Sequence, residues 1–157
     1  MMKPTDLMDL AIAKAREGIA AGQSPFGCAI ARGDEVLAVS HNIVWATTDI
    51  TAHAEINALR EACRTARQIL LEGAVVATTC EPCPMCMAAL LWARVATVYY
   101  GATIEDAAAA GFHEVHLSAV EMTAHSGHRL DLVPDVRRPE CVALFDEWLS
   151  RPDHRAY

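Results

Sequence analysis

AVVATTCEPCPMCMAALLWARVATVYY, residues 74–100, is the stretch that decides the fold. Its apolar run from Ala74 to Thr79 predicts a buried strand. Pro84 suits the first turn of a helix that we expect to reach about Arg94, and residues 95–100 predict a second strand. A strand, a helix and a strand with short joins form a parallel crossover unit, with helices on both faces of the sheet. We therefore expect an α/β fold.

A helix and a hairpin precede this unit. Thr5 is expected to cap a helix that ends near Gly22. Residues 28–32 and 35–40 predict two strands, and the Gly-Asp pair at 33–34 suits a tight turn between them. The apolar face of the helix consists of Met8, Ile12, Ala15 and Ile19.

Shorter elements and a tail are expected in the C-terminal third. The predicted elements are an alanine-rich helix that stops at Gly111, a helix over residues 115–124, a strand over 128–133 and a last helix with Pro139 in its first turn. Residues 151–157 are polar and would normally fray in solvent. Tyr157 at the end of this tail is an aromatic residue that we expect to dock, so the tail is a candidate for closing an active site.

Length and charge limit the class of protein. The 157 residues fit one domain over 1–157, without a linker or an internal repeat. The net charge is −7, without a cluster of basic residues, so a small-molecule substrate is favoured over nucleic acid. No apolar run approaches the roughly 20 residues of a membrane helix. The N-terminus lacks the pattern of a signal peptide, so we expect a cytoplasmic protein.

Three of the six cysteines are bunched as Cys80, Cys83 and Cys86. In a reducing compartment, bunched cysteines favour metal binding over disulfides. The remaining cysteines lie in apolar patterns typical of inert buried thiols, and they are Cys28, Cys63 and Cys141.

His53 and Glu55 lie at the start of a helix expected from about Ala52. One imidazole and two thiolates, from Cys83 and Cys86, would hold Zn²⁺ and leave its fourth position open to water, as a catalytic site requires. Zinc lowers the pKa of such water towards neutrality. A carboxylate at Glu55 could carry protons from the water to a ring nitrogen and then to departing ammonia.

Two other interpretations of the possible metal ligands stay open. Cys80 could complete a structural zinc site with His53 and the other two cysteines, in a non-enzymatic binding module. Four histidines could hold a second metal, although surface histidines are commoner, and they are His113, His116, His125 and His128.

The spacing H-x-E followed by P-C-x-x-C is a signature of zinc-dependent nucleobase deaminases. The sequence resembles the cytidine deaminase superfamily and, within it, the bacterial guanine deaminases. The residues that carry this resemblance are Pro25-Phe26-Gly27, Asn42, residues 51–55, 79–86, 92–94 and 107–112, and Tyr157. The resemblance implies a three-layer α-β-α sandwich with a mixed five-stranded sheet. It also implies a homodimer that exchanges its C-terminal segments.

Roles for further residues follow from the same resemblance. Phe26 and Trp92 would line the base pocket, and Asn42 and the backbone of Ala54 would hydrogen-bond the ring edge. Tyr157 would reach into the partner's pocket. From the residues alone, Phe26 and Trp92 could equally be core residues, and Asn42 could be a turn former.

One departure leaves the substrate open. Where the guanine deaminases have Gly-Phe-Asp-Asp, this chain has Gly111-Phe112-His113-Glu114. The last aspartate of that motif takes part in proton transfer and base binding, and Glu114 keeps the carboxylate on a longer stem. We expect a guanine-like deaminase that could also accept pterin or triazine rings. Deaminases of cytosine or a pyrimidine nucleoside, and of adenosine in tRNA, are the alternatives.

Overall fold

The crossover unit of residues 74–100 forms the centre of the sheet. In the computed structural model, which describes residues 1–157, β3 (Val75–Cys80) lies parallel to β4 (Thr97–Ala102). Helix α4 (Pro84–Trp92) connects the two strands. Every residue of β3 is buried, as expected for a strand covered on both faces. The predicted unit is therefore confirmed, with boundaries that differ by one or two residues.

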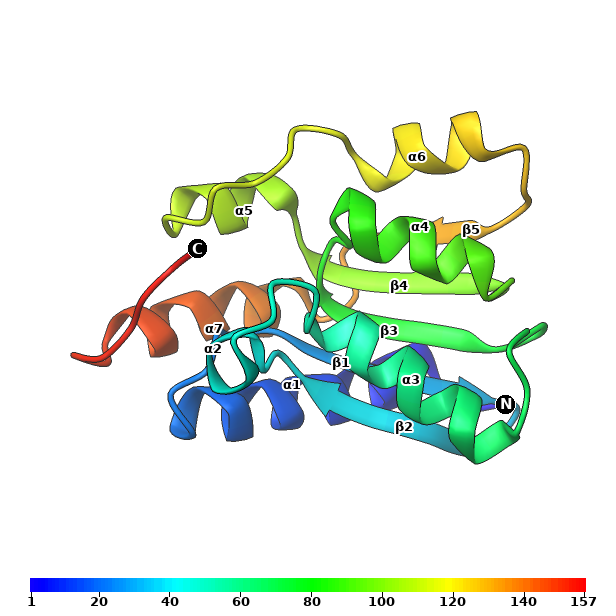
Figure 1. Ribbon diagram of the computed structural model, residues 1–157, viewed down its shortest axis with the longest axis horizontal. Coiled ribbons are helices and arrows are strands. Elements are labelled where there is room, and N and C mark those ends of the chain that lie inside the picture. The colour runs from blue at the N-terminus through cyan, green and yellow to red at the C-terminus, as the bar shows by residue number, and fades with distance from the viewer.

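The sheet has five strands in the order β2-β1-β3-β4-β5 (Figure 1). Strand β1 (Gly27–Arg32) is antiparallel to both β2 (Glu35–His41) and β3, whereas β4 is parallel to β5 (Asp131–Val133). A mixed five-stranded sheet between helices is the architecture that the resemblance implies. Strands β2, β3 and β4 run in one direction, so their carboxyl ends meet at one edge of the sheet.

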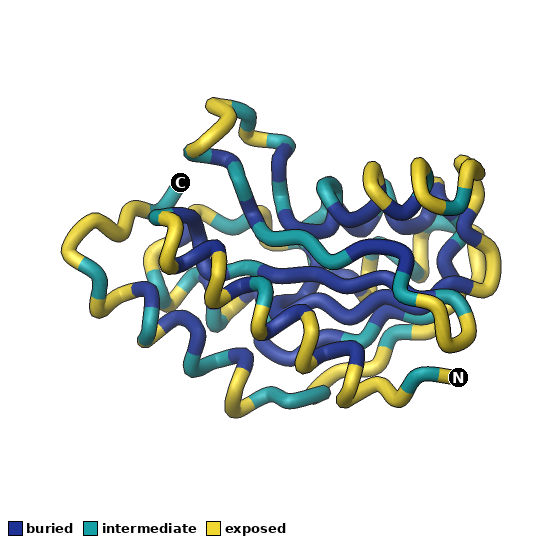
Figure 2. Tube along the Cα trace, turned by 90° about the horizontal axis from the view of Figure 1, so that it is seen from below, coloured by how far each residue is buried: buried dark blue, intermediate teal, exposed yellow.

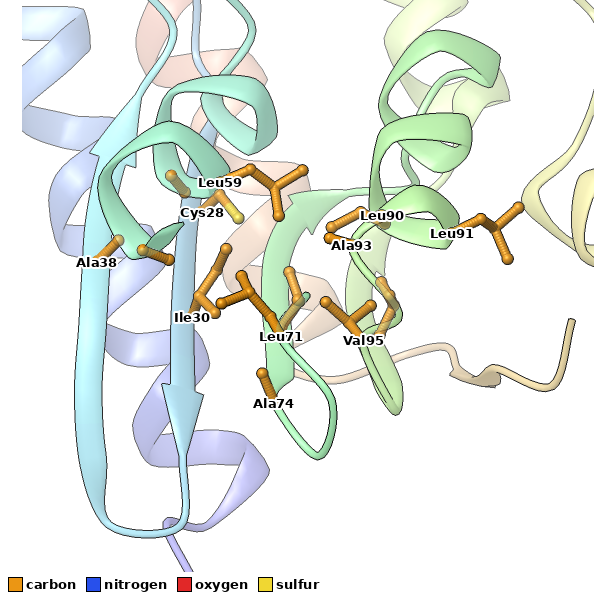
Figure 3. Close-up of a cluster of buried hydrophobic side chains, with 14 of the residues drawn as sticks. Cys28, Ile30, Ala38, Leu59, Leu71, Ala74, Leu90, Leu91, Ala93 and Val95 are labelled. Carbon is orange, nitrogen blue, oxygen red and sulfur yellow. The ribbon is translucent and has the colours of Figure 1, made fainter. Parts of the chain in front are cut away.

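Helices cover both faces of the sheet. Helices α1 (Pro4–Ala20) and α7 (Arg138–Leu149) pack on one face, and α3 (Ala54–Ala66), α4 and α6 (Ala119–Ser126) lie on the other. The strands in the middle are the most deeply buried part of the chain (Figure 2). Alternate residues of β1 enter different cores: Cys28 and Ile30 join the α3–α4 side (Figure 3), and Ala29 and Ala31 join the α1–α7 side.

Two short helices follow strands at the carboxyl edge. Helix α2 (Val44–Thr47) comes after β2, and α5 (Ile104–Ala109) comes directly after β4. The sequence did not predict α2, because four residues are too few to show a helical period. The hairpin turn at residues 33–34 is confirmed, with a positive φ of 63° at Gly33.

Gly27 allows α1 to approach the sheet closely. A Cβ atom at this position would lie 2.0 Å from the carbonyl oxygen of Ala11 and 2.9 Å from the backbone nitrogen of Ala15. Helix α1 therefore packs against the backbone of β1 without an intervening side chain. This contact also fixes Phe26, the preceding residue, at the carboxyl edge of the sheet.

Some predicted boundaries are wrong. Helix α1 begins at Pro4 rather than after Thr5, and Lys3 precedes it without a side-chain cap. The helix predicted over 115–124 is α6, which begins later because Ser118 and Glu121 form its capping box. The apolar face predicted for α1 is buried as expected. None of the helices is long and apolar enough to cross a membrane.

Candidate active site

Two helix N-termini meet at the carboxyl edge of the sheet. His53 is the residue immediately before α3, and Cys83 is the residue immediately before α4. Both have extended backbone conformations, and Pro84 begins α4 at the position where proline is favoured. Cys86 lies in the first turn of α4 and is fully buried. The chain thus brings an imidazole and two thiols to one point.

The geometry of these three groups fits a tetrahedral metal ion. The Nδ1 atom of His53 lies 3.6 Å from Sγ of Cys83 and 3.5 Å from Sγ of Cys86. The ligand atoms of the three residues all lie within 4.8 Å of one another. Typical Zn–S and Zn–N bond lengths at a tetrahedral angle give a nitrogen–sulfur separation of about 3.6 Å. The donor set and its spacing therefore suit zinc.

Cys80 does not belong to this group. Its thiol donates a hydrogen bond to the carbonyl oxygen of Thr103, at 3.3 Å, and its side chain is buried. A four-ligand structural site with Cys80 is thus not what the structure assembles. The four histidines of the other alternative form no metal-binding group either.

Electrostatics at the site favour a cation. A hydrogen bond from Cys86, opposed by burial and helped by His53, lowers the pKa of Cys83 to about 4. The same coupling with Cys83, together with burial, raises the pKa of Cys86. A divalent ion would allow both to be thiolates.

Glu55 points into the cavity next to this group. The side chain is 6% exposed, and Oε1 accepts a hydrogen bond of 3.0 Å from the hydroxyl of Thr78 on β3. Burial, together with the nearby charge of Cys83, raises the pKa of the Glu55 carboxyl group. A carboxyl group in this setting can hold or release a proton at modest cost.

Glu114 reaches the same cavity from the segment between α5 and α6. Burial, reinforced by the charge of Cys83, raises the pKa of Glu114 to about 7. The carboxyl group is half-buried and is therefore not simply a solvated surface charge.

The cavity itself has a volume of about 230 Å³ and is mainly apolar. Neither lysine nor arginine lines it. The lining residues are Phe26, Asn42, Ile50, His53, Glu55, Cys80, Glu81, Cys83, Pro84, Met85, Phe112, His113, Glu114, Val115 and Tyr157.

Asn42 combines the two roles considered for it. Its Oδ1 atom accepts a hydrogen bond of 3.1 Å from the backbone of Val44, which is a turn-forming contact. Asn42 also lines the cavity, where its Nδ2 atom donates a hydrogen bond of 2.6 Å to the hydroxyl of Tyr157. Ala54, the first residue of α3, is buried beside His53, and its N–H group has no partner within the helix.

The structure does not bring Trp92 to this cavity, which corrects the expectation that Trp92 lines the base pocket within its own chain. Trp92 is the last residue of α4, and its side chain is 77% exposed. Because a helix rises about 1.5 Å per residue, Trp92 lies about 9 Å along the helix axis from Cys86 and about 13.5 Å from Cys83.

The tail folds back onto its own chain. The ring of Tyr157 lies 5.4 Å from that of Phe112 and 5.6 Å from that of His53, between ring centroids. Arg155 stacks on Trp45 at 3.9 Å, and the indole N–H of Trp45 donates to the carbonyl oxygen of Arg155. In this structure Tyr157 therefore occupies the cavity of its own chain, whereas the resemblance implied the cavity of a partner.

Several lining residues were not assigned by the sequence. Thr78 does not line the cavity itself but bonds Glu55, and its signal was a pair of threonines, Thr78 and Thr79, in an otherwise apolar strand. Phe112 stood in the altered motif before Glu114, but nothing in the sequence indicated that it would pack against both Phe26 and Tyr157. Nothing in the sequence indicated that Ile50 and Met85 would line the cavity.

Comparisons with known proteins agree with this site. The family model of the cytidine and deoxycytidylate deaminase zinc-binding region matches residues 1–102. Guanine deaminase from Bacillus subtilis is 43% identical over 148 residues, covering 94% of each chain. A tRNA-specific adenosine deaminase from Agrobacterium fabrum is 40% identical over 102 residues, covering 65% of this chain and 67% of the relative.

The fold is shared with a solved structure of guanine deaminase from Nitrosomonas europaea. The two structures superpose with a TM-score of 0.88 and 26% sequence identity, covering 96% of this chain and 87% of the other. The matched sequence region contains His53, Cys83 and Cys86. The chain belongs to the cytidine and deoxycytidylate deaminase zinc-binding family.

Proposed function

We propose that this chain hydrolyses the exocyclic amino group of a guanine-like base and releases ammonia. The observation that carries the proposal is that His53, Cys83, Glu55 and Glu114 line one cavity, while the third donor, Cys86, is buried with its Sγ atom 3.5 Å from Nδ1 of His53. The similarity to guanine deaminases over nearly the whole chain supports the choice of a purine base.

Zinc is the metal that His53, Cys83 and Cys86 would hold. When bound, it supplies Lewis acidity and activated water next to the substrate. Glu55 cannot serve as a fourth ligand of a catalytic site, because that position must stay open. Its carboxylate instead would carry two protons in turn, one from the attacking water to the ring nitrogen and one from the hydroxyl group of the adduct to the leaving amino group, which departs as ammonia.

Substrate recognition would rest on both faces and edges of the base. Phe26 supplies an apolar wall, while Asn42 Nδ2 and the N–H group of Ala54 can donate hydrogen bonds to acceptors on the ring. Glu114 would bond the amino or imino edge and take part in proton transfer. Its carboxyl group lies where the resemblance implies an aspartate, on a stem one methylene longer.

The size of the cavity favours a free base. At about 230 Å³ it is smaller than the 300–1,000 Å³ typical of drug-sized ligands. Tyr157 also covers it. A single planar ring system suits this space better than a nucleotide within a polymer.

The tRNA-editing reaction is the second candidate, because a tRNA-specific adenosine deaminase is 40% identical over 102 residues. The net charge of −7 opposes binding of a polyanion. Ammonia release from amino-substituted purines, pyrimidines, pterins and triazines, measured beside a tRNA substrate, separates these candidates. Activity on tRNA alone would refute the proposed free-base substrate.

Replacement of Glu55 should abolish proton transfer. We expect Glu55→Gln to lower kcat by about 10²–10⁴-fold, since an amide cannot carry the proton. Zinc content should remain one ion per chain, because Glu55 is not a ligand. Glu61→Gln is a matched control: this carboxylate lies on the same helix, is exposed and bonds Ser40. Near-normal turnover of Glu55→Gln would exclude the proposed mechanism.

Replacement of Glu114 tests whether this carboxylate works on the substrate. Glu114→Gln should lower kcat/KM by about 10- to 100-fold, and Glu114→Asp should change the ranking of substrates in the panel. The control variant, Glu105→Gln, removes an exposed charge from α5 and should change neither property. If both Glu114 variants match the parent across the panel, the carboxylate has no role in the reaction.

We also propose that residues 151–157 close the active site. Their removal should leave folding and zinc content intact and lower kcat/KM by about 10²-fold, the scale of losing a closing element. Tyr157→Phe, which loses only the bond to Asn42, should have a smaller effect. Asp153→Ala serves as the control, because its carboxylate bonds only Arg151. Unchanged constants for the truncated chain would mean that the tail closes nothing.

A homodimer is the assembly that we propose. Trp92 projects beside a largely apolar groove between α3 and α4, and such exposed patches are typical of interfaces. Sedimentation equilibrium should give twice the chain mass of 17.0 kDa. Trp92→Asp should shift the protein towards monomer, whereas Val120→Asp, an exposed site on α6, should not. A monomeric parent protein would contradict the proposal.

A further inference from the structure

Glu81 has a buried carboxylate that belongs to neither the metal-binding group nor the proposed proton carriers. It follows β3 directly, and its side chain is 9% exposed. One oxygen, Oε2, accepts a hydrogen bond of 3.1 Å from the backbone N–H of Ile104. The other, Oε1, accepts one of 3.0 Å from the backbone N–H of Ala119. Both oxygens are thus engaged by the main chain.

Ile104 and Ala119 are the first residues of α5 and α6. The N–H group of a first helical residue has no partner within its helix. Each helix also has its own capping box, from Thr103 and Asp106 in α5 and from Ser118 and Glu121 in α6. Those boxes act within one helix. Glu81 is the side chain that connects the two helix starts.

The segment between these two bonds carries part of the cavity wall. Phe112, His113, Glu114 and Val115 all lie between Ile104 and Ala119, and all line the cavity. Two residues after Glu81, Cys83 begins the turn that supplies the thiols. A single carboxylate therefore fixes both ends of the Glu114 segment relative to the turn that carries Cys83. Its hydrogen bonds are charge-assisted, which makes them stronger than neutral ones.

We propose that Glu81 is a positioning residue that sets the place of Glu114 relative to the His53–Cys83–Cys86 group. As far as catalysis is concerned, this rests on the proposed function, in which Glu114 works on the substrate. Glu81 lines the cavity, but both of its carboxylate oxygens accept backbone hydrogen bonds, so this proposal gives it no part in proton transfer. It acts through the backbone of α5 and α6.

A double-mutant cycle tests the connection to Glu114. Glu81→Gln keeps one acceptor but presents an N–H group to the other amide, so one of the two bonds is lost. We expect kcat/KM to fall by about 10-fold or more in the parent and by less than about 3-fold in Glu114→Gln. Zinc content should stay unchanged in all four proteins. Equal losses in both backgrounds, or none in the parent, would overturn the proposal.

Ala119→Pro provides a second route if Glu81→Gln does not fold. Proline is tolerated at the first position of a helix, and Ser118 has the extended backbone that precedes proline readily. This variant removes the N–H group that Glu81 accepts and should reproduce the loss of kcat/KM. Ala119→Gly, which retains the N–H group, should not. Glu121→Ala removes the N3 side chain of the α6 capping box without touching the connection and should leave kcat/KM within about 3-fold of the parent.

Amide hydrogen exchange separates this proposal from the proposed function. In Glu81→Gln and Ala119→Pro, residues 110–118 should exchange faster by about 10-fold, while the first turn of α3 keeps its protection. This readout needs no substrate. If the parent showed no deaminase activity, the proposed function would fail, and unchanged exchange in both variants would separately refute the connection made by Glu81.

Discussion

The ligand atoms of His53, Cys83 and Cys86 lie within 4.8 Å of one another, and this proximity limits how the helices and strands that carry them can be arranged. They come from two helix N-termini, and each helix must enter its site from an extended residue that turns its side chain inward. The parallel pairing of β3 with β4 fixes where α4 can begin, because a crossover helix starts at the carboxyl end of its strand. Packing of α3 against β1 and β2 brings His53 to the same edge. The order of the strands in the sheet therefore brings the three donor residues to one place.

The fold also gathers several acidic groups around the cavity. Three carboxyl groups and two thiols line a cavity that neither lysine nor arginine lines, and they are Glu55, Glu81, Glu114, Cys80 and Cys83. The proximity of these groups and their burial raise the pKa values of Cys86, Glu55 and Glu114, whereas hydrogen bonds lower the pKa of Cys83. A divalent cation would compensate two negative charges at once and so relieve the repulsion. The net negative charge of the chain disfavours binding of polyanions, and the acidic groups around the cavity favour binding of a metal cation.

Local patterns in the sequence predicted the crossover unit, the hairpin and the residues nearest the donor group, because these features depend on spacing within a few residues. The start of α1 was misjudged because Pro4 begins the helix without needing Thr5 as a cap. Trp92 lies at the end of α4 farthest from Cys83 and does not line the cavity of its own chain. Contacts such as Phe112 with Phe26, and Tyr157 with Asn42, join residues far apart in sequence, and only the folded topology reveals them.

The bond between Asn42 and the hydroxyl of Tyr157 makes the tail an intramolecular competitor for the edge of the cavity. Because the tail is tethered, its effective concentration at the site is high and does not depend on the amount of protein. A ligand that needs the amide of Asn42 must first displace that hydroxyl or share it. Its measured affinity is then its intrinsic affinity reduced by the fraction of chains in which the amide is free. Under the proposed function, a ring that offers Asn42 a strong acceptor would overcome this competition more readily than a weakly hydrogen-bonding ring, while the rest of the tail still covers the cavity.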